Sequence, residues 1–256
     1  MLSYQILGPV TTVTGDVEFS VGGPRERKAL GVLLLDANRP TTVARLADVL
    51  WEGRPPRSAG AQIRNVVAIL RRTISEATGQ AAPIRRAGQG VVITVAEGQL
   101  DLDVFRARAR TAAGLADAGD YARASGELRR GLALWRGPLF GGVTSSVLDI
   151  DVYQLEEERL AALEHLLELE VALGRARAVV GELAALTARY PLRERLIELY
   201  MLALDRSGRR TAALEVFTTA RARLRDEAGL DPRRQLLELH AALLRGEAGT
   251  AVLARP

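Results

Sequence analysis

Residues 57–72, RSAGAQIRNVVAILRR, concentrate side chains that can bind nucleic acid. The segment holds four arginines and Asn65 but no Asp or Glu. Arginine can donate two hydrogen bonds to guanine, asparagine can pair with adenine in the same way, and small residues let a backbone come close. The apolar residues recur with the period of a helix, at Ile63, Val66, Val67 and Leu70. The pattern predicts a helix with one buried face and one acid-free face.

The face opposite Ile63 supplies most of the side chains that we expect to contact DNA. Arg64 and Asn65 are expected to bond base edges, with Ser58 and Ala68 beside them. Phosphates are expected to be held by Arg57, Arg71, Arg72, Arg85, Arg86 and the start of a helix at Thr41 and Thr42. Arg71 lies at the edge of the buried stripe and has an alternative role, bracing the domain through an acid such as Glu76 or Asp48.

The charge of the chain is unevenly distributed. Residues 1–100 carry 12 Lys+Arg against 8 Asp+Glu, whereas residues 101–256 carry 23 of each. Phosphate is the commonest partner of such a basic concentration. The alternative is a solvated basic surface, although exposed helices usually also carry Glu to pair with their arginines.

The elements around this segment predict a winged helix-turn-helix, in which the second helix of a pair enters the major groove. Short β-branched runs punctuated by glycine indicate three strands within residues 4–21, and Gly22-Gly23-Pro24 opens a first helix. Thr41 or Thr42 is expected to cap a second helix, and Ser58 a third over residues 58–74. Gly88 and Gly90 flank the turn of a hairpin in which Val91, Ile93 and Val95 alternate.

A repeat follows from Asp101 onward. Gly174-Arg175 and Gly208-Arg209 stand 34 residues apart, the tetratricopeptide period, and Gly119 begins a more distant copy. Similar residues recur at fixed offsets from the three glycines: −7 (Ala112, Leu167, Met201), +5 (Ala124, Val179, Ala213), +9 (Leu128, Leu183, Phe217), +14 (Ala133, Ala188, Ala222) and +16 (Trp135, Tyr190, Leu224). Small residues are expected where paired helices approach. Such arrays stack into a curved surface for partners.

The predicted fold is mainly α with a small β part. Residues 1–98 are expected to form the winged helix-turn-helix, residues 101–246 an all-α, tetratricopeptide-like domain of three irregular helix pairs, and residues 247–256 a flexible tail.

Little in the sequence points to catalysis. There is no cysteine, and His165 and His240 lack metal-ligand spacing. No P-loop motif is present, and Glu156-Glu157-Glu158 is read as a solvated face. We therefore expect no enzyme, cofactor or metal. No apolar run approaches the roughly 18 residues of a membrane span, so we expect a cytoplasmic, nucleoid-associated protein.

The order of these elements resembles the SARP family of antibiotic regulatory proteins, in which an OmpR-type winged helix precedes a bacterial transcriptional activator domain. The resemblance runs from Leu2 to about Arg245. It rests on Leu7-Gly8-Pro9, RERKALGVLLLDANRPTTVARLADVLWEGRPP, Leu70-Arg71-Arg72, LWRGPL, LALDRSGRRTAALEVF and AGLDPRRQLLELH. By motif position, Arg64, Asn65 and Ala68 fall on the groove-facing part of the family's recognition helix. Ala68 and Gly90-Val91 depart from the Ser and Gly-Tyr of many members.

The resemblance implies a transcriptional activator of the small type, probing promoter DNA as a homodimer. It would bind tandem direct repeats overlapping the −35 region of double-stranded promoter DNA, within an antibiotic gene cluster. RNA polymerase holoenzyme, including its sigma factor, would be its partner. The alternative is a repeat-built adaptor whose winged helix docks protein rather than DNA, which would bind DNA weakly and without sequence preference.

Overall fold

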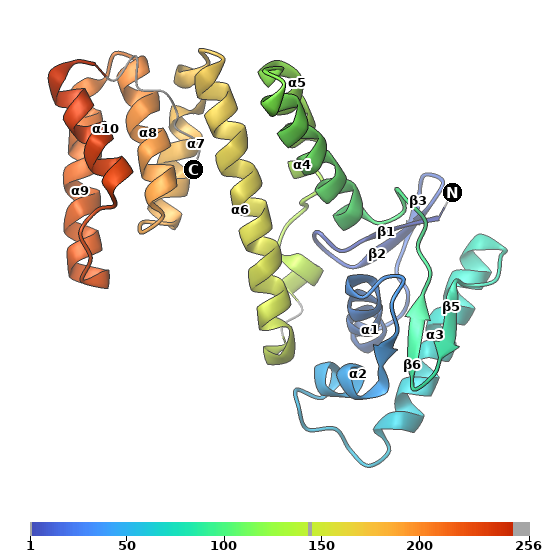
Figure 1. Cartoon of the computed structure of the whole chain (residues 1–256). Coiled ribbons are helices and arrows are strands. Elements are labelled where there is room, and N and C mark those ends of the chain that lie inside the picture. Colours follow the sequence, from blue (N-terminus) through green and yellow to red (C-terminus); the bar gives the residue numbers. More distant parts are fainter. Residues whose placement is uncertain (1, 143–144, 248–256) are drawn as a thin grey trace. The chain divides into compact units, whose positions relative to one another are not determined.

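The computed structural model describes residues 2–142 and 145–247, and they form a mainly helical protein with two small antiparallel sheets (Figure 1). This confirms the predicted fold class. The expected tail lies, from residue 248 on, outside the described residues. The elements in chain order are β1 (Leu2–Gln5), β2 (Thr11–Thr14), β3 (Val17–Phe19), α1 (Pro24–Leu35), β4 (Thr41–Thr42), α2 (Val43–Leu50), α3 (Ala59–Thr78), β5 (Ile84–Ala87), β6 (Gly90–Ile93), α4 (Asp101–Asp117), α5 (Tyr121–Leu132), η1 (Leu139–Gly142), η2 (Ser146–Leu148), α6 (Asp149–Ala172), α7 (Ala176–Arg189), α8 (Glu194–Arg206), α9 (Arg210–Ala228) and α10 (Arg234–Arg245).

The chain divides into two compact units, and neither is continuous in sequence. One comprises Met1–Arg110 and Arg130–Arg159, and we call it the winged-helix unit. The other comprises Thr111–Arg129 and Leu160–Pro256, and we call it the repeat unit.

The first sheet of the winged-helix unit has the strand order β1-β2-β3, with Tyr4 opposite Thr12. β1 ends at Gln5, so Ile6 and Leu7 lie outside the strand. The backbone N–H groups of Ile6 and Leu7 instead donate to the carboxylate of Asp101, at 2.9 and 3.0 Å. Burial raises the pKa of Asp101, although these hydrogen bonds oppose the shift. The carboxylate thus replaces a neighbouring strand as hydrogen-bond acceptor.

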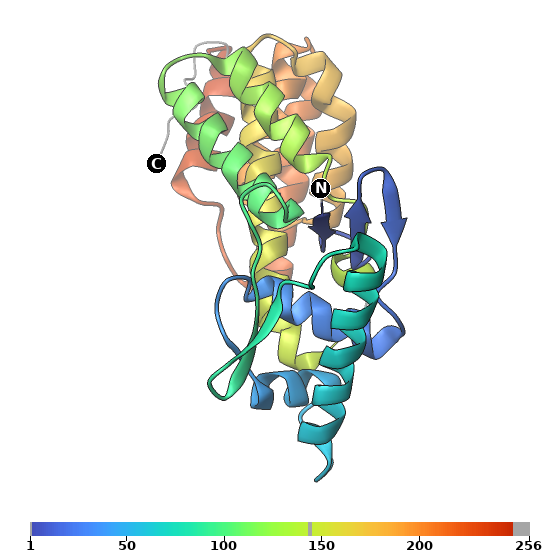
Figure 2. The ribbon, with the colours of Figure 1, turned by 90° about the vertical axis from the view of Figure 1, so that its right-hand side faces the viewer.

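The second sheet has the strand order β4-β6-β5, with β6 in contact with α1 and β4 in contact with α2 (Figure 2). The sequence analysis missed β4, because two residues are too short to show any periodicity. Its pairing makes β6 the central strand, and all four β6 residues are buried. The expected alternation along the hairpin is therefore wrong within β6. Gly90 is needed there, since a Cβ would lie 2.3 Å from the carbonyl oxygen of Thr41.

The repeat is visible as the helix pairs α4–α5, α6–α7 and α8–α9, followed by α10 (Figure 1). Gly119, Gly174 and Gly208 end the first helix of each pair with φ of 81°, 76° and 79°. The residue after each glycine donates its N–H to a carbonyl five residues earlier, as in Asp120 to Leu115 at 2.9 Å. This is the Schellman motif at a helix end. It favours glycine because the residue at this position adopts a positive φ. The periodic glycines therefore terminate helices.

The recurring positions of the repeat differ in burial. Residues at offsets −7, +5 and +9 are all buried, as the packing argument requires. The alanines at offset +14, which are Ala133, Ala188 and Ala222, are instead exposed. The interpretation of that offset as a helix contact is wrong, because small size alone does not distinguish a tight contact from a helix-favouring surface position.

A buried carboxylate joins successive helices of the repeat unit. Glu170 of α6 has a side chain only 2% exposed and bonds the Ser125 hydroxyl of α5. Arg129 reaches it at 2.9 Å and Arg175 at 3.2 Å. Burial alone would raise the pKa of Glu170, but these donors hold it below its ordinary value. The ionised carboxylate is thus satisfied within the fold.

Candidate nucleic-acid interface

The helix α3 has the two faces that its sequence predicts. Ala59, Ile63, Val66, Val67, Leu70 and Ile74 are buried. The opposite side is exposed at Arg57, Ser58, Ala61, Arg64, Asn65, Ala68 and Arg72. The helix runs beyond the expected end at residue 74, to Thr78, and stops at Gly79 with φ of 67°. Residues 57–75 contain no acid, so the exposed face stays positive over most of the helix.

Ser58 stands at the start of α3 but does not cap it, which corrects the sequence-based assignment. Its φ and ψ of −86° and 4° are not the extended conformation typical of a capping residue, and its side chain makes no capping hydrogen bond. The hydroxyl instead accepts from Gln62 Nε2 at 3.0 Å. Ser58 remains exposed at the end of the helix.

The β5–β6 hairpin is attached to α3 through Arg71. The Nε of Arg71 donates to the carbonyl oxygen of Ile84 at 2.8 Å. The alternative role of Arg71 as a brace is thereby supported, but its partner is a backbone carbonyl rather than Glu76 or Asp48. Glu76 lies 4.0 Å from Arg72, and both of those side chains are about 70% exposed. Such an exposed ion pair contributes little to the stability of the fold.

The arginines of the hairpin, Arg85 and Arg86, lie exposed on β5. They share the winged-helix unit with α3, and Figure 1 shows β5 and β6 alongside that helix. Because Arg71 fixes the first residue of β5, the two arginines follow directly from an anchored point. The exposed arginines of α3 and those of β5 therefore lie on two elements that the hydrogen bond of Arg71 connects.

Thr41 and Thr42 differ sharply, although the sequence grouped them. Thr41 is 1% exposed, and its hydroxyl donates to Asp36 at 3.0 Å. Because its side chain is buried, it cannot contact a phosphate. Thr41 is therefore removed from the expected DNA-contact residues. Thr42 is exposed and caps α2 by accepting from the Arg45 backbone N–H at 3.1 Å.

Two arginines near this surface were missed by the sequence analysis. Arg45, in the first turn of α2, is held by Asp36 and Asp151, each at 3.1 Å. Arg25 of α1 lies 5.5 Å from the ring of Trp51 and donates to Gln62 of α3 at 3.4 Å. No spacing in the sequence reveals these partners, because they come from different segments of the chain.

The acidic residue within the α2–α3 connection, Glu52, is paired with a cation. Glu52 pairs with Lys28, and its carboxylate also accepts from the Ser146 backbone N–H at 3.2 Å. The hydrogen bond from Lys28 is the main cause that lowers the pKa of Glu52 below its ordinary value. The positive character of the neighbouring α3 face is therefore not offset by a free carboxylate at this point.

The described residues contain no cluster of His, Cys, Asp and Glu that could hold a metal ion. Glu158, part of the acidic run on α6, pairs with Arg106 at 2.7 Å, and His240 stacks on Phe217 with ring centroids 3.8 Å apart. Among the same described residues, no helix has the length and hydropathy needed to cross a membrane.

Comparisons with known proteins found similar sequences over nearly the whole chain. Residues 100–244 match the bacterial transcriptional activator domain. Regulatory protein AfsR of Streptomyces coelicolor is 38% identical over 98% of this chain, which spans only 25% of AfsR. Regulatory protein DnrI of Streptomyces peucetius is 32% identical, and the match covers 97% of this chain and 94% of DnrI.

A solved structure is also similar to this chain. The structure of Mycobacterium tuberculosis EmbR in complex with a low-affinity phosphopeptide matches with a TM-score of 0.91 and 31% identity. The match covers 96% of this chain and 65% of that one.

Proposed function

We propose that this chain, which belongs to the SARP family of transcriptional regulators, activates transcription by reading promoter DNA with α3. Residues 1–98 are the DNA-binding part and residues 101–246 the activator part. The regulated genes are those of a secondary-metabolite cluster.

The observation that carries the proposal is the exposed, acid-free face of α3. Four arginines and Asn65 are exposed along residues 57–72, while the apolar face is buried. A helix with such a face fits the major groove, where arginine and asparagine side chains discriminate bases. Arg64 and Asn65 are assigned to base edges, with Ser58 and Ala68 allowing close approach.

The remaining cations are assigned to phosphates, which position a protein without carrying sequence information. Arg57, just before α3, and Arg72, within it, flank the reading residues, and Arg85 and Arg86 extend the contact from β5. Thr42 brings the start of α2 to the backbone, where helix N-termini favour anions. Arg71 contributes mainly by holding the hairpin in place.

Family likeness supports the finer mechanism. Two copies bind tandem direct repeats beside the −35 element as a homodimer, and the assembly recruits RNA polymerase holoenzyme through its sigma factor. Since the family contains both short and long relatives, its shared part accounts for binding and activation in this proposal.

A footprint on DNA upstream of neighbouring genes, with and without polymerase holoenzyme, tests the proposal. Cooperative protection of two tandem sites beside the −35 element is the expected result. Weak, salt-sensitive protection without sequence preference would contradict it and would favour the adaptor alternative.

A further inference from the structure

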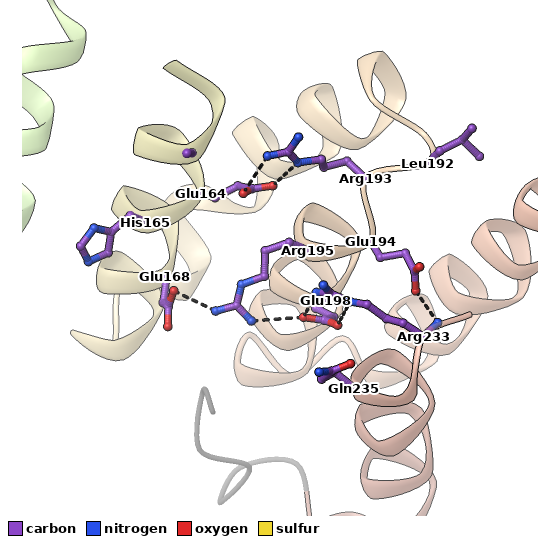
Figure 3. A pocket seen from close by; sticks show the side chains of 11 residues that line it. Glu164, His165, Glu168, Leu192, Arg193, Glu194, Arg195, Glu198, Arg233 and Gln235 are labelled. Atoms are coloured by element: carbon purple, nitrogen blue, oxygen red, sulfur yellow. Dashed lines mark hydrogen bonds and ion pairs between the residues drawn. The ribbon is translucent and has the colours of Figure 1, made fainter. Parts of the chain in front are cut away.

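A cavity of about 610 Å³ opens within the repeat unit (Figure 3). Its walls come from α6, from the connection into α8 with the start of that helix, and from the connection into α10 with its first turn. The volume falls in the range of ligand sites, roughly 300–1,000 Å³. Helical repeats commonly present concave surfaces of this kind to partners.

Seven of the eleven residues that line the cavity are charged. Four glutamates and three arginines face it, which leaves one net negative charge among these seven residues. Arg195 forms ion pairs with two glutamates, Glu168 of α6 at 2.8 Å and Glu198 of α8 at 3.1 Å. Arg233, before α10, reaches Glu198 at 2.8 Å. The arginines are thereby committed to carboxylates of the cavity itself, as Figure 3 shows.

The carboxylates keep more unused capacity than the arginines do. Glu194 accepts the backbone N–H of Arg233 through Oε2 at 2.7 Å, and Glu168 is engaged by Arg195 also through Oε2. Because an ionised carboxylate has about four acceptor sites, both groups can still take hydrogen bonds from a donor.

Two other kinds of ligand fit this lining less well. Sites for small apolar molecules are lined predominantly by hydrophobic side chains, whereas here only Ala161 and Leu192 are apolar. A phosphorylated ligand needs uncommitted arginines and positive potential. The net negative charge and the engaged arginines oppose it.

We propose that this cavity binds an extended peptide segment of another protein, and that the segment carries lysine or arginine side chains. A peptide backbone supplies both donors and acceptors, which suit the mixed Glu, Arg and Gln235 lining. Its basic side chains donate to Glu168 and Glu194. Leu192, 42% exposed, offers an apolar contact at the cavity. The site lies in the repeat unit and goes beyond the proposed DNA contacts.

Peptide selection on the full chain tests this assignment. Peptides are selected from a random dodecapeptide phage library in the presence of excess duplex DNA, which occupies the basic face of α3. Selected peptides are then synthesised with a fluorophore and titrated by anisotropy against three variants. Ala161→Trp fills the cavity from an exposed position of α6. Ala172→Trp, also exposed on α6 but outside the cavity, is the matched control.

The third variant, Glu194→Gln, removes a charge but keeps an oxygen that accepts the Arg233 N–H. The expected peptides contain Lys or Arg and bind Ala172→Trp like the natural chain. Their affinity falls roughly tenfold or more in Ala161→Trp and in Glu194→Gln, the loss typical of one charge-assisted hydrogen bond. Thermal unfolding of each variant verifies folding, and Glu194→Gln still decides the matter if Ala161→Trp is unstable.

Three results would overturn the proposal. The first is that no selected peptide distinguishes the natural chain from either cavity variant. The second is that the distinguishing peptides lack basic residues, or that phosphoserine analogues bind more tightly. The third is that spermidine displaces them with equal or better affinity, which would make a free polyamine the occupant. None of these outcomes depends on DNA recognition, which the footprint tests separately.

Discussion

Arg71 of α3 donates its Nε hydrogen to the carbonyl oxygen of Ile84 at 2.8 Å, which ties α3 to the first residue of the β5–β6 hairpin. The helix and the basic hairpin are therefore coupled by a side chain that looks, in the sequence, like another phosphate ligand. This coupling separates the roles of neighbouring arginines and makes them testable one by one.

Arg71→Met should destabilise the protein by about 1 kcal/mol, because the apolar stem remains while the hydrogen bond to Ile84 is lost. Thermal unfolding measures the change, and hydrogen exchange of the hairpin should locate it. Arg72→Met is the matched control, since Arg72 is exposed and makes only a 4.0 Å pair with Glu76. Equal stability of the two variants would remove the bracing role.

Arg64→Ala should weaken binding to the preferred DNA site by roughly 1–3 kcal/mol and relax the preference at one base position. The reason is that a bidentate contact to a base edge is lost. Gel-shift titration on a set of single-base variants of the site is the measurement. Arg223→Ala removes the same charge from an exposed position of α9 and should leave the preference intact. An unchanged base preference in Arg64→Ala would exclude Arg64 from base reading.

Arg85→Ala should weaken binding to all sequences alike, because a phosphate contact carries no base information. The slope of log affinity against log salt should fall by about one. Gel shifts at several salt concentrations, on specific and unrelated duplexes, check both points. A sequence-selective loss would instead place Arg85 at a base.

Gly90→Ala should destabilise the winged-helix unit by about 1–3 kcal/mol, as overpacking does. The added Cβ would meet the Thr41 carbonyl oxygen at 2.3 Å and force β4 from β6. Gly114→Ala is the control, because no neighbour lies within 4 Å of its Cβ and its backbone is helical. That variant should gain roughly 0.5–1 kcal/mol. Denaturant unfolding compares them, and a tolerated Gly90→Ala would contradict the close strand approach.

His240→Phe should reduce the loss of stability on mild acidification. Burial, and then the charge of Arg221, lower the pKa of His240 below the ordinary 6.5. The unfolded state therefore binds a proton first as pH falls below about 6.5, and the folded state loses stability until its own lower pKa is reached. Phenylalanine keeps the stack on Phe217 and does not titrate. Unfolding measured at pH steps between 8 and 5 should show a flatter profile, and identical profiles would refute the assignment.

The sequence predicted the elements whose signals are local. The face of α3 follows from a single apolar stripe, and its exposed residues agree with that stripe position by position. The helix ends of the repeat follow from glycine, because the left-handed conformation favours that residue at each of them. Thr42 as the cap of α2 was one of two equivalent readings, and the structure selected between them.

What the sequence by itself determined is which segments are helical, which faces are buried and where positive charge is concentrated, since periodicity and composition act over a few neighbouring residues. The tertiary structure alone decided the partners of individual polar groups. Thr41 is buried, and the carboxylate of Asp101 accepts a hydrogen bond from the backbone N–H of Ile6, 95 residues away. Arg193 likewise pairs with Glu164, 29 residues away. The physical reason is that long charged side chains reach many positions, and only the packing of distant segments determines which of these they contact.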